Sequence, residues 1–273
     1  MESLQTPFMV ALLVAYVLAF MFYFITFIYA KVALKNTAKL LIVLAFVLNT
    51  GLLVIRGLLI SGLPLRNLFE FGLFFIWAIT LVFLFIEYKF DLSVSALFVL
   101  PIVILLLLFL VNLDVTVRPA MPALRSKWLI IHVLTAVLAY GAFAISFALS
   151  VMYLVKDWLG GENSPNRLAS IMPRLELLDE LSYKVIFLGM PALTIMLVTG
   201  AVWAEYSWGR YWSWDPKETW ALVTWFVYSA YLHIRLRGWK GKKAAIISIV
   251  GFMAVIFTFL GVSYLLPGIH SYA

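Results

Sequence analysis

Eight long apolar segments constrain the fold of this chain more than any other feature. They cover approximately residues 8–30, 40–60, 68–87, 92–112, 128–155, 182–203, 218–237 and 244–266. Each has the length of about 20 residues that an α-helix needs to cross a bilayer. With 65% hydrophobic and 12% charged residues, the chain also carries more apolar surface than a water-soluble domain can bury. The sequence therefore predicts an all-α integral membrane protein with about eight transmembrane helices, forming a single polytopic domain over residues 1–273.

Two of these segments and one connection need comment. Pro101 interrupts the fourth span, and its boundaries are therefore less sharply defined. The first apolar run follows no basic start and precedes no small-residue cleavage site, so we expect it to remain as a membrane span. The connection 157–181 is the longest, and the leucines of its segment 175–181 alternate with charged residues. That spacing predicts a short amphipathic helix lying on the membrane surface.

The distribution of basic residues predicts the orientation of the chain. Thirteen lie in the connections after the first, third, fifth and seventh spans: Lys31, Lys35, Lys39, Lys89, Lys156, Arg167, Arg174, Lys184, Arg235, Arg237, Lys240, Lys242 and Lys243. Seven lie on the other side: Arg56, Arg66, Arg118, Arg125, Lys127, Arg210 and Lys217. Cytoplasmic loops carry the excess of Lys and Arg. We therefore expect both termini to be outside, and we read the net charge of +7 as loop charge that sets orientation, not as a nucleic-acid footprint.

A run of tryptophans, residues 208–220, stands between two of the spans. Trp208, Trp212, Trp214 and Trp220 lie within thirteen residues, together with Arg210 and Lys217. Indoles gather where membrane helices meet water, so an interfacial belt is one interpretation. The other is a flat, polarisable surface for a planar apolar ligand whose acidic edges meet Arg210 or Lys217. Haem has that shape and chemistry.

The end of this run has the pattern of a helix start. Asp215 is placed as the N-cap, Pro216 at the first helical position and Glu218 at the third, where its side chain reaches back. No nucleophile or second base lies nearby in the sequence to support acid–base chemistry. We therefore interpret both carboxylates as capping groups that hold the tryptophan loop against the following helix.

Two of the three histidines lie on the same side as the tryptophan run. His132 stands at the outer start of the fifth span, and His270 follows the last span. Two neutral imidazoles that face each other across a stacking surface would make a bis-histidine site for haem iron. The alternative for each is an interfacial histidine that only forms hydrogen bonds. The coincidence of both with the indoles favours ligation.

His233 lies at a different depth. It is 13 residues beyond Trp220, or about 20 Å along a helix, toward the cytoplasmic side of the membrane. An ionisable residue at membrane depth is a candidate functional residue, although it could also snorkel beside Arg235 and Arg237. No other histidine of this chain reaches that depth. If His233 binds iron, the opposite ligand therefore comes most simply from a partner subunit.

A second outer loop precedes the third span. Gly62 and Pro64 indicate a turn, and Asn67 is placed to cap the helix that follows. The loop could also form a wall of the outer site, but the turn and cap explain it sufficiently.

These motifs together resemble a known family. The spacing Trp208-Gly209-x-x-Trp212-x-Trp214-Asp215-x-x-Glu218 is similar to the WWD motif of proteins that handle haem in cytochrome c maturation. The segments Trp128…His132, Tyr231-Leu232-His233 and Gly268-Ile269-His270-Ser271-Tyr272 extend the likeness to the CcsA (ResC) family of the two-component cytochrome c synthase system. With the loop Pro64…Glu70, the resemblance covers nearly the whole chain.

The resemblance implies a site and partners. His132 and His270 would be the two outer axial ligands of haem b, the WWD loop at about residues 204–220 would cradle the haem edge, and His233 would be one ligand of a transmembrane haem site. The CcsB (ResB) protein would supply the missing inner histidine. Apocytochrome c would be the acceptor, and because this chain has no cysteine, another protein would keep the acceptor's thiols reduced. The protein would be a haem lyase subunit of the bacterial cytoplasmic or the thylakoid membrane, with its site on the outer or lumenal side.

Two other functions fit the composition less well. A b-type cytochrome that passes electrons to or from a quinone usually pairs four helix histidines around two haems, and this chain has three. A transporter with tryptophans along its pore would bind no iron and would leave the placement of His132 and His270 unexplained. An absorption spectrum of the purified protein distinguishes the transporter from the other two.

Overall fold

The computed structural model describes residues 5–29, 33–117 and 122–266, which form helices joined by short loops. The long helices are α1 (Gln5–Tyr29), α2 (Ala33–Ile60), α3 (Leu68–Phe90), α4 (Ala96–Leu110), α5 (Lys127–Trp158), α7 (Leu175–Trp208), α8 (Pro216–Leu236) and α9 (Lys242–Ile256). α9 continues through a π-helical turn, η5 (Phe257–Gly261), into α10 (Val262–Leu265). Shorter elements are α6 (Arg167–Ile171) and the 3₁₀ turns η2 (Ser93–Ser95), η3 (Pro122–Leu124) and η4 (Gly161–Asn163).

Seven helices in the described ranges are long and apolar enough to cross a membrane. The all-α membrane fold is thereby confirmed. The eighth predicted span, 218–237, coincides with α8, which is long enough but more polar than the others because it begins with Lys217 and Glu218 and ends with His233 and Arg235. The number of eight spans, and the side on which the termini lie, remain predictions.

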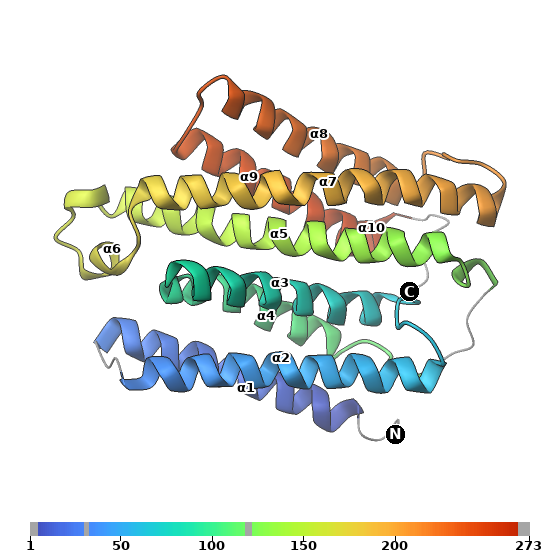
Figure 1. Ribbon diagram of the computed structural model, residues 1–273, viewed down its shortest axis with the longest axis horizontal. Coiled ribbons are helices and arrows are strands. Elements are labelled where there is room, and N and C mark those ends of the chain that lie inside the picture. The colour runs from blue at the N-terminus through green and yellow to red at the C-terminus, as the bar shows by residue number, and fades with distance from the viewer. Residues whose placement is uncertain (1–4, 30–32, 118–121, 267–273) are drawn as a thin grey trace.

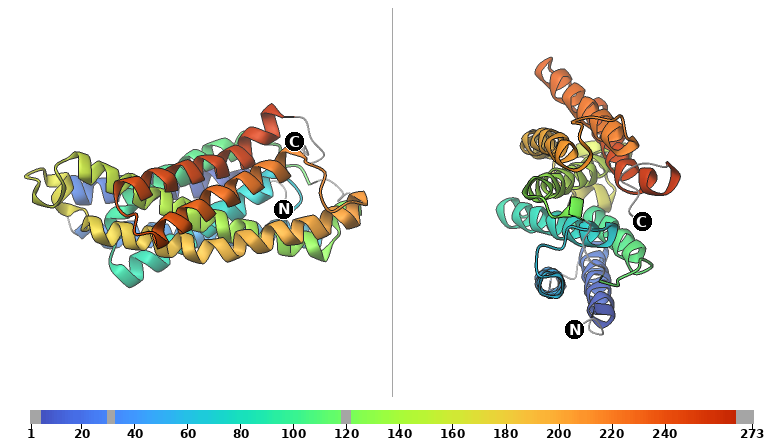
Figure 2. Two further views of the ribbon diagram at one scale, coloured as in Figure 1. Left: turned by 90° about the horizontal axis from the view of Figure 1, so that it is seen from above. Right: turned by 90° about the vertical axis from the view of Figure 1, so that its right-hand side faces the viewer.

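The helices run back and forth along one direction and stack in successive layers. Figure 1 shows α1 and α2 at one edge, then α3 and α4, then α5 and α7, with α8 and α9 at the other edge. The end-on view in Figure 2 shows the same order, with α8 projecting from its edge. The most extensive contact joins α5 to α7, and glycine makes part of it possible: a Cβ on Gly189 would lie 2.8 Å from the ring of Phe143. Small residues allow this close approach of membrane helices.

The predicted amphipathic surface helix at 175–181 is wrong. These residues are the first turns of α7, which runs without a break for 34 residues, and Leu178 and Leu181 are buried in the bundle. Two of the interspersed carboxylates have partners near the helix start, Glu180 with Lys184 and Asp179 with Arg235. Asp179, for example, accepts two hydrogen bonds from Arg235 at 2.8 Å and one from the backbone of Gly241.

The connection before α7 is fixed by a buried lysine. Lys156 in the last turn of α5 donates to Glu162 at 2.9 Å and to the carbonyl oxygens of Met172 and Pro173. The backbone N–H of Leu175 and the Lys156 ammonium together hold the pKa of the Glu162 carboxyl below its usual range. Lys156 therefore orders this loop as well as adding charge to it.

Arg56 is not the loop charge that the sequence suggested. It lies inside α2 with no exposed surface, and its guanidinium pairs with Glu70 of α3 at 2.7 Å. It also donates to Gln5 and to the carbonyl of Val115, both at 2.6 Å. Breaking such a buried pair typically costs about 3–5 kcal/mol. Arg56 thus joins α1, α2, α3 and the segment after α4 at one end of the bundle. Without Arg56, six basic residues remain on the side of the membrane that was predicted to be outside.

Candidate functional site

A pocket opens at the end of the bundle that holds the loops before α3, before α5 and before α8. Residues of α3, η3, α5, α7, α8, η5 and α10 contribute to it, together with the loops before α3 and α8. Most of its lining is apolar: Leu65, Leu68, Phe71, Leu124, Leu129, Val133, Ala136, Met196, Leu197, Ala201, Trp203, Ala221 and Phe259. Polar side chains reach it from several walls: Arg66, Asn67, His132, Tyr140, Trp212, Lys217, Glu218, Thr258 and Ser263. An apolar pocket with a few convergent polar groups is the usual form of a small-molecule site.

His132 is held in a defined orientation within this pocket. It lies in the second turn of α5, half-buried, with its Nδ1 atom 2.8 Å from the carbonyl oxygen of Met196 on α7. Because a carbonyl only accepts, the proton of the neutral ring is on Nδ1 and the lone pair is on Nε2. The indole of Trp203 stacks on the imidazole at 6.3 Å, with 20° between the planes. A backbone carbonyl that fixes the tautomer in this way is typical of histidines that bind metal.

The close approach of α7 to His132 requires a glycine. A Cβ on Gly200 would lie 2.6 Å from Nδ1 and 2.7 Å from Cε1 of His132, closer than side chains tolerate. The ring therefore has to rotate, and the hydrogen bond to Met196 has to break, when Gly200 is replaced by any larger residue.

If the pocket is the haem site that the sequence resemblance implies, Gly200→Ala should insert normally but bind much less haem than the wild type, because the imidazole is turned from its present direction. Haem per protein, measured by absorbance after purification, checks this. Gly51→Ala in α2 is the matched control, since its Cβ would lie 3.8 Å from Phe8. Equal haem content in the Gly200 variant and the wild type would contradict this account of the ring.

The tryptophan loop proper is shorter than the predicted 204–220. α7 continues to Trp208, Gly209 ends it in the left-handed conformation with φ 72°, and α8 begins at Pro216. Asp215 is the N-cap of α8: its side chain accepts from the backbone N–H of Lys217 at 3.0 Å, while Glu218 accepts from the backbone of Asp215 at 3.2 Å. The predicted capping box is confirmed. Trp214, one residue earlier, has φ 60°, a strained conformation for a residue with a side chain.

The four indoles of the run do not form one flat surface, contrary to the prediction. Trp208 meets Trp203 edge-on at 6.4 Å, and Trp220 packs on Phe257 at 4.3 Å. Trp212 and Trp214 stand nearly perpendicular, at 88°. Only Trp212 of the four lines the pocket. The loop turns too sharply between Gly209 and Pro216 for successive rings to share a plane.

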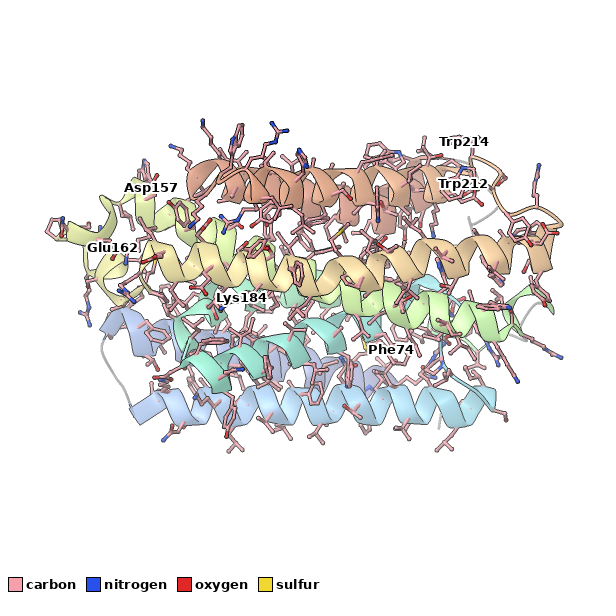
Figure 3. All side chains as sticks on the ribbon, turned by 45° about the horizontal axis from the view of Figure 1, so that its top comes forward. Phe74, Asp157, Glu162, Lys184, Trp212 and Trp214 are labelled. Carbon is pink, nitrogen blue, oxygen red and sulfur yellow. The ribbon has the colours of Figure 1, made fainter. Side chains whose placement is uncertain are left out.

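The structure brings some of the predicted site residues together and separates others. His132, Trp212 and Glu218 line one pocket, with Asp215 buried behind Glu218 as its capping partner. Trp208, Gly209, Arg210 and Trp214 are not part of the lining, and Arg210 is exposed. Figure 3 shows Trp212 and Trp214 on the loop after α7, at the opposite end of the molecule from Asp157 and Glu162. His270 lies outside the described residues.

His233 is far from this pocket. It lies 17 residues beyond Pro216 on the same helix, or roughly 25 Å at 1.5 Å per residue. Its side chain is exposed on α8, near the ion pair between Arg235 and Asp179. His132 and His233 therefore cannot share one iron.

Comparisons with known proteins decide the family. The family model for the cytochrome C assembly protein matches residues 65–270. The cytochrome c biogenesis protein CcsA of Trieres chinensis is 36% identical in an alignment of 272 positions, and the match covers 88% of this chain and 87% of that protein. The CcsA protein of Gloeobacter violaceus is 34% identical in an alignment of 280 positions, and the match covers 82% of each chain. This chain belongs to the CcsA family. Family membership places it in cytochrome c biogenesis and disfavours the electron-transfer and transporter alternatives.

A solved structure supports the fold of this CcsA-family chain. The cytochrome c haem lyase CcmF superposes on it with a TM-score of 0.72, at 18% sequence identity. The match covers 95% of this chain and 46% of that one, so this chain spans less than half of the larger protein. At this identity the likeness shows a shared helix arrangement.

Several residues of this CcsA-family pocket were not identified from the sequence. Trp203 lies outside the tryptophan run, is 2% exposed, and donates to the carbonyl of Ala123 at 2.9 Å. Met196 contributes through its backbone, which no sequence pattern reveals. In the loop before α3 the predicted cap is confirmed, because the side chain of Asn67 accepts from the backbone N–H of Glu70 at 2.9 Å. Asn67 and Arg66 also line the pocket, which agrees with the alternative interpretation of this loop as a wall.

Proposed function

We propose that this chain presents haem b in the outer pocket for covalent attachment to apocytochrome c, as one subunit of a haem lyase with a CcsB/ResB-type membrane protein. The observation that carries the proposal is the orientation of His132. Its ring is fixed by the Met196 carbonyl inside an apolar pocket that also contains Trp212 and Glu218. The donor set, a neutral imidazole beside indoles, suits haem iron and its apolar ring.

The second axial ligand in this proposal is His270. Ser263, seven residues before it, lines the pocket. Seven residues span at most about 25 Å of extended chain, which is ample for an imidazole to reach the pocket. Two imidazole ligands together would position the haem and occupy both axial sites of its iron until the acceptor arrives.

In the reaction, haem is a substrate and the acceptor is a Cys-x-x-Cys-His segment. Each thiol adds across one vinyl group: the sulfur–hydrogen bond breaks, a carbon–sulfur bond forms, and the proton goes to the other vinyl carbon. The addition needs no oxidant. The chain contributes positioning and ligation, while Asp215 and Glu218 cap α8 and hold the tryptophan loop. Another protein keeps the acceptor thiols reduced.

Reconstitution of the purified chain with its partner tests this function. We expect covalent haem on an apocytochrome c, detected as haem that stays with the polypeptide after denaturation, only when both membrane proteins and reduced haem are present. An acceptor in which both cysteines are replaced by serine is the control. Covalent attachment that is equally fast without this chain would contradict the proposed role.

A further inference from the structure

Two basic residues line the pocket on different walls. Arg66 comes from the loop before α3, and Lys217 comes from the first turn of α8; both are half-buried. Within the described part of the chain, neither has a carboxylate at ion-pair distance. The guanidinium of Arg66 donates one hydrogen bond, at 3.0 Å, to the carbonyl of Ile60, which leaves most of its five N–H groups for other acceptors.

The acidic residue in the pocket lining, Glu218, is already engaged. One carboxylate oxygen of Glu218 accepts from the backbone N–H and the hydroxyl of Ser213, at 2.8 and 3.2 Å, and from the backbone of Asp215. Asp215 in turn caps α8 through Lys217's own backbone N–H. These contacts fix the tryptophan loop and leave the pocket with more positive than negative side chains.

Two half-buried cations in a mostly apolar pocket, beside one carboxylate that already accepts other hydrogen bonds, are costly unless an anion pairs with them. We propose that Arg66 and Lys217 bind the two carboxylates of the ligand, so that the pocket selects a planar apolar dicarboxylate over its neutral ester. This rests on the proposed function of the pocket as a haem site and adds the basis of its selectivity. Arg66 can bind one carboxylate with two parallel hydrogen bonds, and Lys217 supplies a point charge for the other.

Arg210, which the sequence offered alongside Lys217 as a partner for such an acidic edge, is a weaker candidate. It is exposed in the loop between α7 and α8 and does not line the pocket. A charge exposed to water binds a carboxylate weakly because solvent screens the attraction. Arg66 is the better candidate because the loop before α3 lines the pocket. The carboxylate of Glu70 fixes this loop by accepting a hydrogen bond from the backbone N–H of Arg66 at 2.7 Å.

The test compares haem with haem dimethyl ester, titrated by absorbance into the full-length protein. The wild type is expected to prefer the diacid by about tenfold or more for each charge-assisted contact. Arg66→Gln and Lys217→Met should each lower that preference by about tenfold, whereas Arg66→Lys and Lys217→Arg keep part of it. Arg125→Gln and Lys127→Met, which change exposed cations near the same end, are the matched controls.

The preference ratio separates recognition from a structural role. If Arg66 only held the loop through Ile60, its loss would weaken both forms of the ligand equally and the ratio would stay at the wild-type value, which would overturn the proposal. Equal affinity of the wild type for diacid and diester would overturn it as well, while haem binding itself stood. Loss of the preference in Arg210→Gln alone would assign the role to Arg210 instead.

The same comparison with metal-free protoporphyrin removes the contribution of iron. Quenching of tryptophan fluorescence reports its binding, and His132→Ala should leave the preference for diacid over diester in place. Failure of every porphyrin, with or without iron, to bind the wild type would contradict the proposed function and this inference together. Binding of the metal-free diacid with no preference over its ester would contradict the inference alone.

Discussion

Replacing His132 or His270 by alanine is expected to abolish covalent haem attachment, and added imidazole is expected to restore it in part. Free imidazole can fill a vacant coordination position because the pocket around it remains. For His132 the rescue should be clear, since Trp203 and Met196 still shape the space that the ring leaves. The measurement is covalent cytochrome c formed with and without imidazole, alongside the absorption spectrum of the purified complex.

Ile131→Ala is the matched control for His132. Ile131 neighbours it on α5 but is 42% exposed, and its truncation should leave haem attachment near the wild-type level. Normal assembly in both histidine variants would end the bis-histidine proposal for the outer pocket. Assembly lost in His132→Ala but kept in His270→Ala would retain the first ligand and exclude the second.

His233→Ala is expected to deplete haem in the complex at both depths, whereas His132→Ala and His270→Ala should leave the inner site filled. The reason is the direction of transfer: we propose that haem crosses the membrane from the inner site, which His233 shares with the partner, to the outer pocket, so that the inner site supplies the outer one. The exposed position of His233 on α8 allows a histidine of a CcsB/ResB-type partner to face it, which supports the shared inner site. Haem content and spectra of the complex, measured for each single variant, test the order.

Leu236→Ala is the control for that experiment. Leu236 is 82% exposed at the end of the same helix, and its removal should not change haem loading. An outer pocket that is fully loaded in His233→Ala would contradict the relay, and His233 would then be a structural residue of α8. Haem bound by His233 in this chain purified without any partner would contradict the shared ligation.

Some of the molecule followed from local sequence signals. The apolar lengths predicted the helices, because a segment of about 20 apolar residues has few alternatives to a buried helix. The spacing Asp-Pro-x-Glu predicted the capping box at Asp215, and Asn67 was identified as a cap, since both are contacts within one helical turn. The separation of His233 from the outer residues followed from the rise per residue alone.

Contacts between distant segments were decided only by the tertiary structure. The sequence assigned Arg56 to a loop, whereas packing buries it beside Glu70 and Gln5, because a buried arginine is recognised only through its partners. The sequence predicted a surface helix at residues 175–181, because its charged residues resemble the polar face of an amphipathic helix. In the structure, Asp179 of this segment pairs with Arg235 of α8 and with the backbone of Gly241 in the following loop. The sequence also predicted that the four tryptophans share one surface. Their ring planes differ because the backbone turns at Gly209 and Trp214, which the residue spacing does not reveal.

The pocket shows this division most clearly. Sequence alone identified His132, Trp212, Glu218 and Lys217 as candidates, each by residue type and position. It did not identify Met196, whose carbonyl orients the histidine, or Gly200, which makes room for it. It also placed the binding cation at Arg210 or Lys217, whereas the fold brings Arg66 to Lys217 instead. Residue chemistry and helix periodicity are local properties of a sequence, but the direction of a lone pair and the pairing of charges depend on how helices far apart in the chain pack together.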